Sequence, residues 1–238
     1  MKLPSLVPAG ALLVLFHIQA PGGTISLDFN SLPSAQGWTY LTSGQTESSI
    51  FSVDGVALHQ NSLGTGLGAG GTAYQHYQLD SVVDPTKPFT IEIRARVLES
   101  EILDLGGFAF GATNGSEQFA IFIDTHTIWG DSFATVISTS IDNTIFHNYR
   151  LDATPGVGYN FFVDGSLIAT RAPDASALNR IFLGDVTSGG NARADVTSFT
   201  FEQGSVPEPA GAGLMAVGLA TLAAQAWWTK KRRLRTHR

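Results

Sequence analysis

Three carboxylates stand close together in the segment Glu99-Ser-Glu-Ile-Leu-Asp104, at offsets of 0, 2 and 5 residues. Two carboxylates about 5 Å apart can act as nucleophile and acid in the retaining hydrolysis of a glycosidic bond. Such a pair must be held on a rigid element, but this segment follows an apolar run that ends at Val97 and precedes Gly106-Gly107. We therefore predict a solvated acidic turn and no catalytic residue.

The same segment resembles, without matching, the cluster Glu-x-Asp-x-x-Glu that laminarinase-type jelly-roll glycosidases carry on a bulged strand. Glu101 stands where that family has its central aspartate, and Asp104 stands where its acid glutamate should be. The two residue types are exchanged, so the longer carboxylate is missing from the acid position. A polysaccharide hydrolase is therefore the third function considered, behind two noncatalytic ones.

Aspartates near the ends of apolar runs are the candidates for calcium, which takes carboxylate and carbonyl oxygens as ligands. They are Asp124, Asp131, Asp142, Asp185 and Asp195. No run of the type D-x-D-x-D-G occurs, and aspartates also favour turns for local hydrogen bonding. Cysteine is absent, which excludes disulfides and thiolate sites, and no two histidines have H-x-H or H-x-x-x-H spacing. We predict no cofactor and no specific metal site, with calcium as the open alternative.

Aromatic side chains can stack on the faces of sugar rings. Trp129 precedes a glycine in a predicted turn and is the candidate for an exposed stacking surface, with Tyr74 or Tyr77 as further candidates. Trp38 and Tyr40 alternate on one face of a strand, and core packing is the stronger interpretation for that pair.

The hydrophobic pattern of the central region has a period of two residues. In Phe89–Val97, every odd position is apolar and every even position is polar, which is typical of a half-buried antiparallel strand. Similar runs occur at Ile25–Phe29, Ile50–Val53, Ala73–Leu79, Gly107–Gly111, Gln118–Ile123, Phe133–Thr139, Tyr149–Ala153, Tyr159–Val163, Arg180–Leu183 and Val196–Glu202.

Turn residues separate these runs. Asp54-Gly55 and Asp164-Gly165 predict two-residue hairpin turns, and Asn114-Gly115 predicts a link between the flanking strands. The glycine-rich stretch 64–71 predicts a surface loop. No amphipathic helix lies between the runs, so residues 24–203 are predicted to form one all-β domain, an antiparallel two-sheet jelly-roll sandwich.

Three segments resemble the late strands of concanavalin A-like and laminin G-like jelly rolls. They are His147-Asn-Tyr-Arg-Leu-Asp-Ala153, Tyr159-Asn-Phe-Phe-Val-Asp-Gly-Ser-Leu-Ile168 and Arg180-Ile-Phe-Leu-Gly-Asp-Val186. In that fold a tyrosine or tryptophan strand leads into a Y-x-F-x-V-D-G hairpin and then an I-x-L-G strand. Members bind sugars, bind proteins, cleave polysaccharides or only pack, so the resemblance implies a fold and leaves the activity open.

The C-terminal end has three parts in a fixed order. Residues 204–209 form a linker that contains Val206, Pro207, Glu208 and Pro209, and an apolar run without charge follows over residues 210–228. A helix of that length spans about 28 Å, close to the hydrocarbon core of a bilayer. The tail 229–238 is basic and predicts a cytoplasmic C-terminus. Its topology residues are Lys230, Lys231, Arg232, Arg233 and Arg235.

This order resembles the PEP-CTERM sorting signal of Gram-negative bacteria. In that family a membrane-embedded exosortase reads the signal, and the carrier is sorted to the cell surface or into an exopolysaccharide (biofilm) matrix. The resemblance implies that this chain is an exosortase substrate. It also implies a transmembrane helix over residues 210–228 that anchors the protein in a single pass before processing.

The N-terminal end agrees with export. Lys2 precedes an apolar stretch, Leu6–Ile18, the layout of a secretory signal peptide, and we predict cleavage after Gly22. All 20 acidic residues lie between Asp28 and Glu208, where only seven of the 14 basic residues lie, so this region carries a formal charge of 7 − 20 = −13. Such a charge disfavours nucleic acid as a partner.

The sequence therefore predicts an exported, noncatalytic protein of a bacterial surface or extracellular matrix that associates with exopolysaccharide or another glycan. The alternative is a purely structural surface protein without a small ligand, and a jelly-roll glycoside hydrolase comes third. The identity of the glycan and the oligomeric state do not follow from the sequence.

Overall fold

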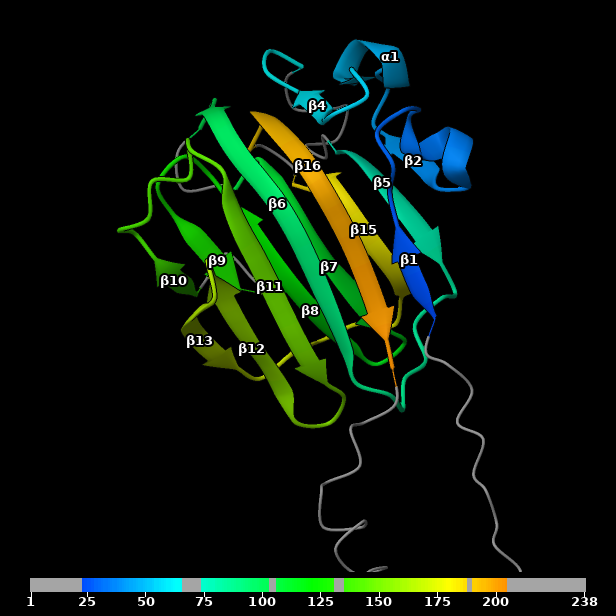
Figure 1. Cartoon of the computed structure of the whole chain (residues 1–238), viewed down its shortest axis with the longest axis vertical. Helices are drawn as coiled ribbons and strands as arrows, with labels where there is room; N and C mark the ends of the chain where they lie inside the picture. The colour runs from blue at the N-terminus through cyan, green and yellow to red at the C-terminus, as the bar shows by residue number, and fades with distance from the viewer. Residues whose placement is uncertain (1–22, 66–73, 103–105, 131–134, 188–189, 205–238) are drawn as a thin grey trace, which may run out of the picture.

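The computed structural model describes residues 23–65, 74–102, 106–130, 135–187 and 190–204 (Figure 1). Two antiparallel sheets pack face to face as a sandwich. The helical segments within the described ranges are η1 (Pro33–Gln36) and α1 (Glu47–Ile50), each a single short turn. The prediction of an all-β, two-sheet sandwich is confirmed.

The first sheet, called sheet A, has eight strands and faces the viewer in Figure 1. Its strand order is β13 (Ser166–Arg171), β12 (Gly158–Val163), β11 (His147–Thr154), β6 (Phe89–Ser100), β16 (Ala192–Gln203), β4 (Leu58–Asn61) and β3 (Phe51–Val53), with β1 (Thr24–Ser26) also paired to β16.

The second sheet, called sheet B, lies behind it and also has eight strands. Its strand order is β10 (Val136–Ser138), β9 (Ile128–Gly130), β8 (Glu117–Ile123), β7 (Phe108–Asn114), β15 (Asn179–Asp185), β5 (Gln75–Asp80) and β2 (Thr39–Thr42), with β14 (Asp174–Ala175) also paired to β8.

The alternation predicted for Phe89–Val97 is confirmed. From Phe89 to Val97 the odd positions of β6 are buried between the sheets, and the even positions are half-buried or exposed on the outer face. The strand does not end at Val97, however. Glu99 pairs with Arg193 and Ser100 with Ala192 of β16, so backbone pairing carries β6 beyond the end of the apolar pattern.

The predicted turns are present, with one change in length. Asp164-Gly165 is a two-residue hairpin turn in which both residues have positive φ, 48° and 79°, as a type I′ turn requires. Asn114-Gly115 links β7 to β8 as predicted. Asp54-Gly55 opens a four-residue loop rather than a two-residue one, because Asp54 Oδ1 accepts hydrogen bonds from the N–H groups of Val56 and Ala57.

Some strand bounds differ from the prediction. The run at Ile25–Phe29 forms β1 over Thr24–Ser26, and Ile50 closes α1 so that β3 begins at Phe51. The run at Phe133–Thr139 forms β10 over Val136–Ser138 in its described part. Apolar pattern alone does not mark where the ladder of backbone hydrogen bonds starts.

The core between the sheets is apolar and rich in aromatic rings. Trp38 is buried and meets Phe199 edge to face at 5.4 Å, which confirms its prediction as a core residue. Tyr149 and Phe161 stack at 6.2 Å on neighbouring strands of sheet A. These contacts fix the outward direction of the intervening polar residues.

The two ends of the described domain lie side by side. Thr24 pairs with Glu202, and the Gln203 N–H donates to the carbonyl of Gly23 at 3.1 Å. Several predicted segments lie outside the described residues: the signal peptide, the sorting motif 206–209, the apolar run 210–228, the basic tail, and residues 66–71 of the predicted glycine-rich loop 64–71. In the part that is described, no helix is long and apolar enough to cross a membrane.

Candidate functional site

The outer face of sheet A carries polar side chains in rows that cross neighbouring strands. In the first row, Thr90 of β6 has Asp152 of β11 on one side and Glu202 of β16 on the other. The Thr90 hydroxyl donates to Asp152 Oδ1 at 3.0 Å. Two carboxylates thus flank a threonine on a rigid part of the sheet.

The second row lies two residues further along each strand. Glu92 of β6 has Arg150 of β11 on one side and Thr200 of β16 on the other. Arg150 Nε lies 3.2 Å from Asp152 Oδ2, and the guanidinium lies 4.1 Å from the centre of the Phe162 ring. Arg150 therefore has an ion pair and a cation–π contact within the protein.

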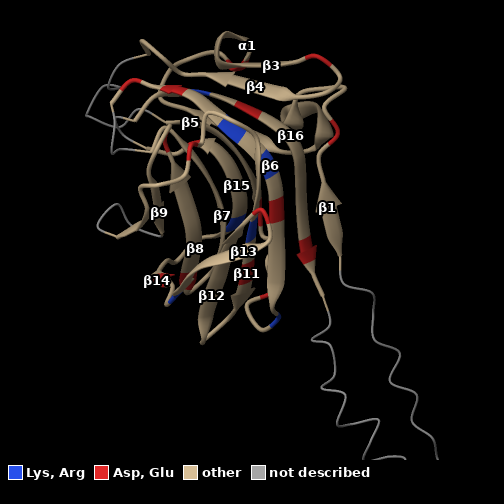
Figure 2. Cartoon of the chain, turned by 60° about the vertical axis from the view of Figure 1, so that its left-hand side comes forward, with Lys and Arg blue, Asp and Glu red and all other residues tan. Residues whose placement is uncertain are grey.

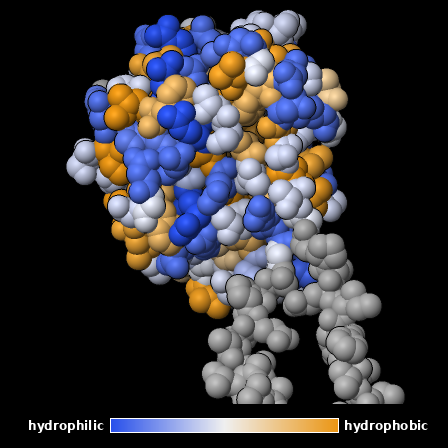
Figure 3. Space-filling view, in the orientation of Figure 1, coloured by the Kyte–Doolittle hydropathy of each residue, from blue (hydrophilic) through white to orange (hydrophobic). Residues whose placement is uncertain are grey.

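These two rows enclose an open hollow of about 330 Å³. We call it the sheet A groove, and its lining residues are Thr90, Glu92, Arg150, Asp152, Thr200 and Glu202. Adjoining hollows of about 380 Å³ and 250 Å³ share lining residues with it and extend it along β6 in both directions. Figure 3 shows hydrophilic residues gathered over this face, and Figure 2 shows acidic positions on both β6 and β16.

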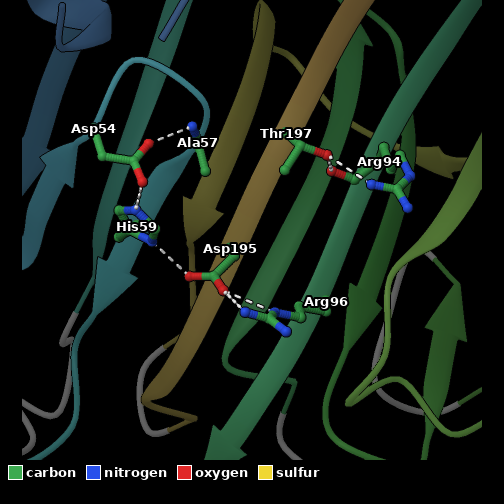
Figure 4. A network of polar contacts seen from close by, with 7 residues as sticks. All are labelled: Asp54, Ala57, His59, Arg94, Arg96, Asp195 and Thr197. Carbon is green, nitrogen blue, oxygen red and sulfur yellow. Dashed lines mark hydrogen bonds and ion pairs between the residues drawn. The ribbon is translucent and has the colours of Figure 1, made fainter.

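A network of ion pairs lies at the far end of the same face (Figure 4). His59 Nδ1 lies 2.7 Å from Asp195 Oδ1 and His59 Nε2 lies 3.3 Å from Asp54 Oδ2. The Nη2 atom of Arg96 forms an ion pair with the other carboxylate oxygen of Asp195, Oδ2, at 2.7 Å. The hydrogen bond to Asp195 raises the pKa of His59. Because both ring nitrogens already face a carboxylate, His59 is arranged as part of an ion-pair network and not as a free base.

Two arginines in this region lie over one ring. The guanidinium groups of Arg94 and Arg96 lie 4.8 Å and 4.5 Å from the centre of the Phe146 ring. Both lie further along β6 than the sheet A groove, and both are held by contacts of their own. Asp195, which was a candidate calcium ligand, serves here as the partner of Arg96 and His59.

The predicted acidic cluster Glu99 to Asp104 is divided among separate partners. Glu99 faces Arg193 at 3.6 Å across the strand pair. Glu101 Oε2 accepts hydrogen bonds from the Asn191 side chain at 2.5 Å and from the Gly64 N–H at 3.2 Å. Asp104 lies outside the described residues. The first two carboxylates thus serve local structure, one on a strand and one at its end.

The other candidate calcium ligands also have local roles. Asp124 caps a turn by accepting from the N–H groups of His126 and Thr127, and Asp142 does the same for Thr144. Asp131 lies outside the described residues. Within the described ranges, no three His, Asp or Glu side chains gather into a group suited to hold a metal ion.

Asp185 is a buried carboxyl at one end of the core. It accepts hydrogen bonds from the Ser62 hydroxyl at 2.8 Å and from the backbone and hydroxyl of Thr187. Burial raises its pKa to about 7. The Ser62 hydroxyl also accepts from the Ala192 N–H, so this network ties β15 of sheet B to β16 of sheet A.

The outer face of sheet B is buried over its central strands, β5, β7, β8, β9 and β15. Trp129 was predicted to stand in a turn, but it lies on β9 and is only 2% exposed, packed with Phe122 and Phe182. The prediction of an exposed stacking surface is therefore wrong for this structure. The reason is that Trp129 pairs with Phe122 and Val136 in a part of the sheet that is buried on both faces.

Tyr74 and Tyr77, the other stacking candidates, are also not free surface rings. Tyr77 is fully buried in the core and Tyr74 is half-buried, 5.8 Å from the ring of His76. His76 itself is 5% exposed and neither ring nitrogen has a hydrogen-bond partner. Burial lowers its pKa to about 4, and the charge of Arg180 acts in the same direction.

Sequence reasoning missed the sheet A groove. The alternation in Phe89–Val97 already marked Thr90 and Glu92 as outward-facing. The same period places Arg150 and Asp152 outward on β11 and Thr200 and Glu202 outward on β16. The strand order, which the pattern does not contain, was needed to bring these three pairs together.

Comparison with known proteins supports the fold. No protein-family model and no curated protein matches the chain. Among solved structures, a sialidase superposes with a TM-score of 0.52 at 10% identity, covering 80% of this chain and 19% of its own. A Crh5 transglycosylase in complex with NAG gives 0.51 at 12% identity, with 79% and 89% covered. The cellulose induced protein Cip1 gives 0.50 at 10% identity, with 74% and 96% covered.

The chain spans about a fifth of the sialidase and most of the other two proteins. At these identities the similarity establishes a shared jelly-roll fold and nothing about residues or activity.

Proposed function

We propose that this chain is a noncatalytic protein that associates with polysaccharide through the outer face of sheet A. The observation that carries the proposal is the sheet A groove, which is open to solvent and lined by hydroxyl, carboxylate and guanidinium groups. Such groups are suited to the dense hydroxyls of a sugar chain. The jelly-roll neighbours named after carbohydrate chemistry are consistent with this use of the fold.

The contacts within the groove support binding more directly than catalysis. Asp152 is engaged by both Thr90 and Arg150, which holds it in one position. Side chains that are already fixed by such contacts lose little conformational entropy when a ligand binds, so they can orient a flexible polymer at low entropic cost.

We also propose that the chain is exported and sorted by its C-terminal signal. By its resemblance to PEP-CTERM proteins, the motif Val206 to Pro209 would be read by an exosortase, and the protein would pass from a membrane-anchored form to the cell surface or matrix. A Pro207→Ala, Pro209→Ala variant should accumulate unprocessed in the membrane fraction. Normal processing and release of this variant, by intact mass, would refute the sorting proposal.

The binding proposal is tested by co-sedimentation of the purified protein with the producing organism's own exopolysaccharide. Thr200→Val removes one groove hydroxyl without changing shape, and the loss of one hydrogen bond should weaken binding roughly fivefold. Thr39→Val makes the same change at an exposed position on β2 of sheet B and should bind as the unaltered protein does.

Three outcomes separate the functions considered. Binding that weakens only in Thr200→Val supports a matrix-associated protein. Absence of binding to any polysaccharide supports the purely structural alternative. Release of new reducing ends from the polysaccharide would instead show a glycoside hydrolase.

A further inference from the structure

The charge of the sheet A groove is unbalanced. Its six lining residues include three carboxylates and one guanidinium, which gives a formal charge of 1 − 3 = −2. The carboxylates of Asp152 and Glu202 stand on either side of Thr90, and Glu92 stands in the next row. They therefore surround the hollow instead of lying along one edge.

Arg150, the one cationic residue that lines the groove, already has partners within the protein. Arg150 is paired with Asp152 and lies over the ring of Phe162. In the described part of the chain, no Lys, Arg or His lies within ion-pair distance of Glu92 or Glu202. Both glutamates are exposed, so two carboxylates remain available to a ligand.

Stacking does not favour a neutral sugar here. None of the six lining residues is aromatic, and the ring of Phe162 on the same face has Arg150 over it. A neutral polymer would have only hydrogen bonds with which to replace its water. An anionic polymer would also face the formal charge of −13 carried between Asp28 and Glu208.

We propose that the sheet A groove selects polysaccharides that carry protonated amino groups, the chemistry of de-N-acetylated amino-sugar polymers. This inference rests on the proposed polysaccharide-binding function and names its ligand class. Ammonium groups along the polymer would pair with Glu92 and Glu202, while ring hydroxyls would bond to Thr90 and Thr200. The rows on β6, β11 and β16 place hydrogen-bond acceptors at regular intervals, which suits a polymer of repeating sugar units.

The test compares two ligands that share a backbone, a β-1,4-linked glucosamine hexasaccharide and its fully N-acetylated form. Binding to the purified full chain is measured by calorimetry, at a pH at which the amines are protonated. We expect the glucosamine ligand to bind roughly tenfold more tightly, because one or two ion pairs at a solvent-exposed site contribute about that factor. The preference should vanish in about 1 M salt, where screening acts over about 3 Å.

Matched variants separate the groove from overall charge. The pair Glu92→Gln and Glu202→Gln should abolish the preference for glucosamine. The pair Glu99→Gln and Asp174→Asn removes two exposed carboxylates outside the groove and should retain it. Circular dichroism confirms that each variant is folded.

Other results would overturn the inference. An equal loss in both double variants would attribute the preference to net charge and not to the groove. Tighter binding of the acetylated ligand would refute the charge selection but leave polysaccharide binding in place. If neither hexasaccharide bound and the organism's own exopolysaccharide did not bind either, the ligand class and the proposed function would both fall.

Discussion

An arginine lies over a phenylalanine ring on each outer face of the sandwich, and the two pairs have different surroundings. On sheet A, Arg150 lies 4.1 Å from the centre of the half-buried Phe162 ring, beside an open groove. On sheet B, Arg180 lies 5.6 Å from the Phe182 ring, which is 3% exposed. The same contact thus borders solvent on one face and belongs to a packed layer on the other.

The polar groups of the two faces differ in the same way. On sheet A, Asp195 is almost completely buried but pairs with both His59 and Arg96. On sheet B, His76 and the Thr113 hydroxyl are buried without a hydrogen-bond partner in the described structure. Unpaired buried groups lower stability, whereas paired or solvated groups do not. The packed apolar rings of the sheet B face, Phe122, Trp129 and Phe182, therefore have to offset these unpaired groups, whereas the sheet A face leaves polar groups open to a ligand.

The largest effect should come from truncating the two phenylalanines. Phe182→Ala should lower the free energy of unfolding by about 3–5 kcal/mol, because it leaves a cavity in a packed layer. Phe162→Ala should lower the free energy of unfolding by only about 1 kcal/mol, because its ring is half-buried. Urea denaturation measures both, and equal losses would show that the two faces are packed alike.

Acid should destabilise sheet B through His76. Its pKa in the folded state, about 4, is below the ordinary value of 6.5. Between pH 6.5 and 4 the unfolded chain binds a proton that the folded protein does not, so stability falls as the pH falls through this window. The difference between these two pKa values corresponds to about 3 kcal/mol of free energy of unfolding.

The His76 contribution is isolated by comparing variants across pH. In His76→Phe the loss assigned to His76 should be absent, and stability at pH 7 should be unchanged or higher because two unpaired nitrogens are removed. His126→Gln alters an exposed histidine and should keep the loss. Identical pH profiles for His76→Phe and the unaltered protein would contradict a buried neutral imidazole.

A methyl group added at Gly111 should test how closely sheet B is packed. A Cβ there would lie 2.4 Å from the Phe119 carbonyl oxygen and 2.9 Å from the Phe182 ring. Gly111→Ala should therefore cost about 1–3 kcal/mol, the usual cost of overpacking. Gly156→Ser, at a turn with positive φ but open space around it, separates steric clash from backbone strain. Comparable stability of Gly111→Ala and the unaltered protein in thermal denaturation would mean that the sheet B face is loosely packed.

The smallest effect concerns His59 on sheet A, and its sign is opposite to that of His76. The pKa of His59 is raised, so its ion pairs contribute stability that is fully present below pH 6.5 and is lost as the pH rises through the folded-state value. His59→Gln should thus be destabilised at pH 6 by less than about 1 kcal/mol, since the group is partly exposed. A difference that persisted unchanged at pH 9 would rule out the ion pairs as its cause.

Much of sheet A could be predicted from sequence because its two faces meet different environments. Phe89–Val97 alternates between core and solvent, and the alternation identifies both the strand and its outward side chains. The turn at Asp164-Gly165 could be predicted for another local reason. A two-residue hairpin turn needs positive φ at both residues, and Asp-Gly is one of the few pairs that adopt it readily.

The strands of sheet B could not be interpreted from alternation in the same way. In β8 the run Phe119–Ile123 is buried on both faces, so its residues show no alternation between apolar and polar types. Trp129 was placed in a turn because Gly130 follows it, but both residues belong to β9, and without alternation in this sheet nothing local indicated a strand whose outer face is buried. The sheet A groove was missed for a different reason, since β11 and β16 join β6 from distant parts of the chain.

The position of β16 determines how the domain would respond to a pull. The strand runs over twelve residues to Gln203, with β6 along one side and β4 and β1 along the other. A force applied beyond residue 203 would therefore enter near the middle of a sheet and not at its edge. Because antiparallel hydrogen bonds lie perpendicular to the strands, that force would load many of them in shear at once. The domain should then resist extension more strongly from this end than from an edge strand such as β13, which would peel one bond at a time.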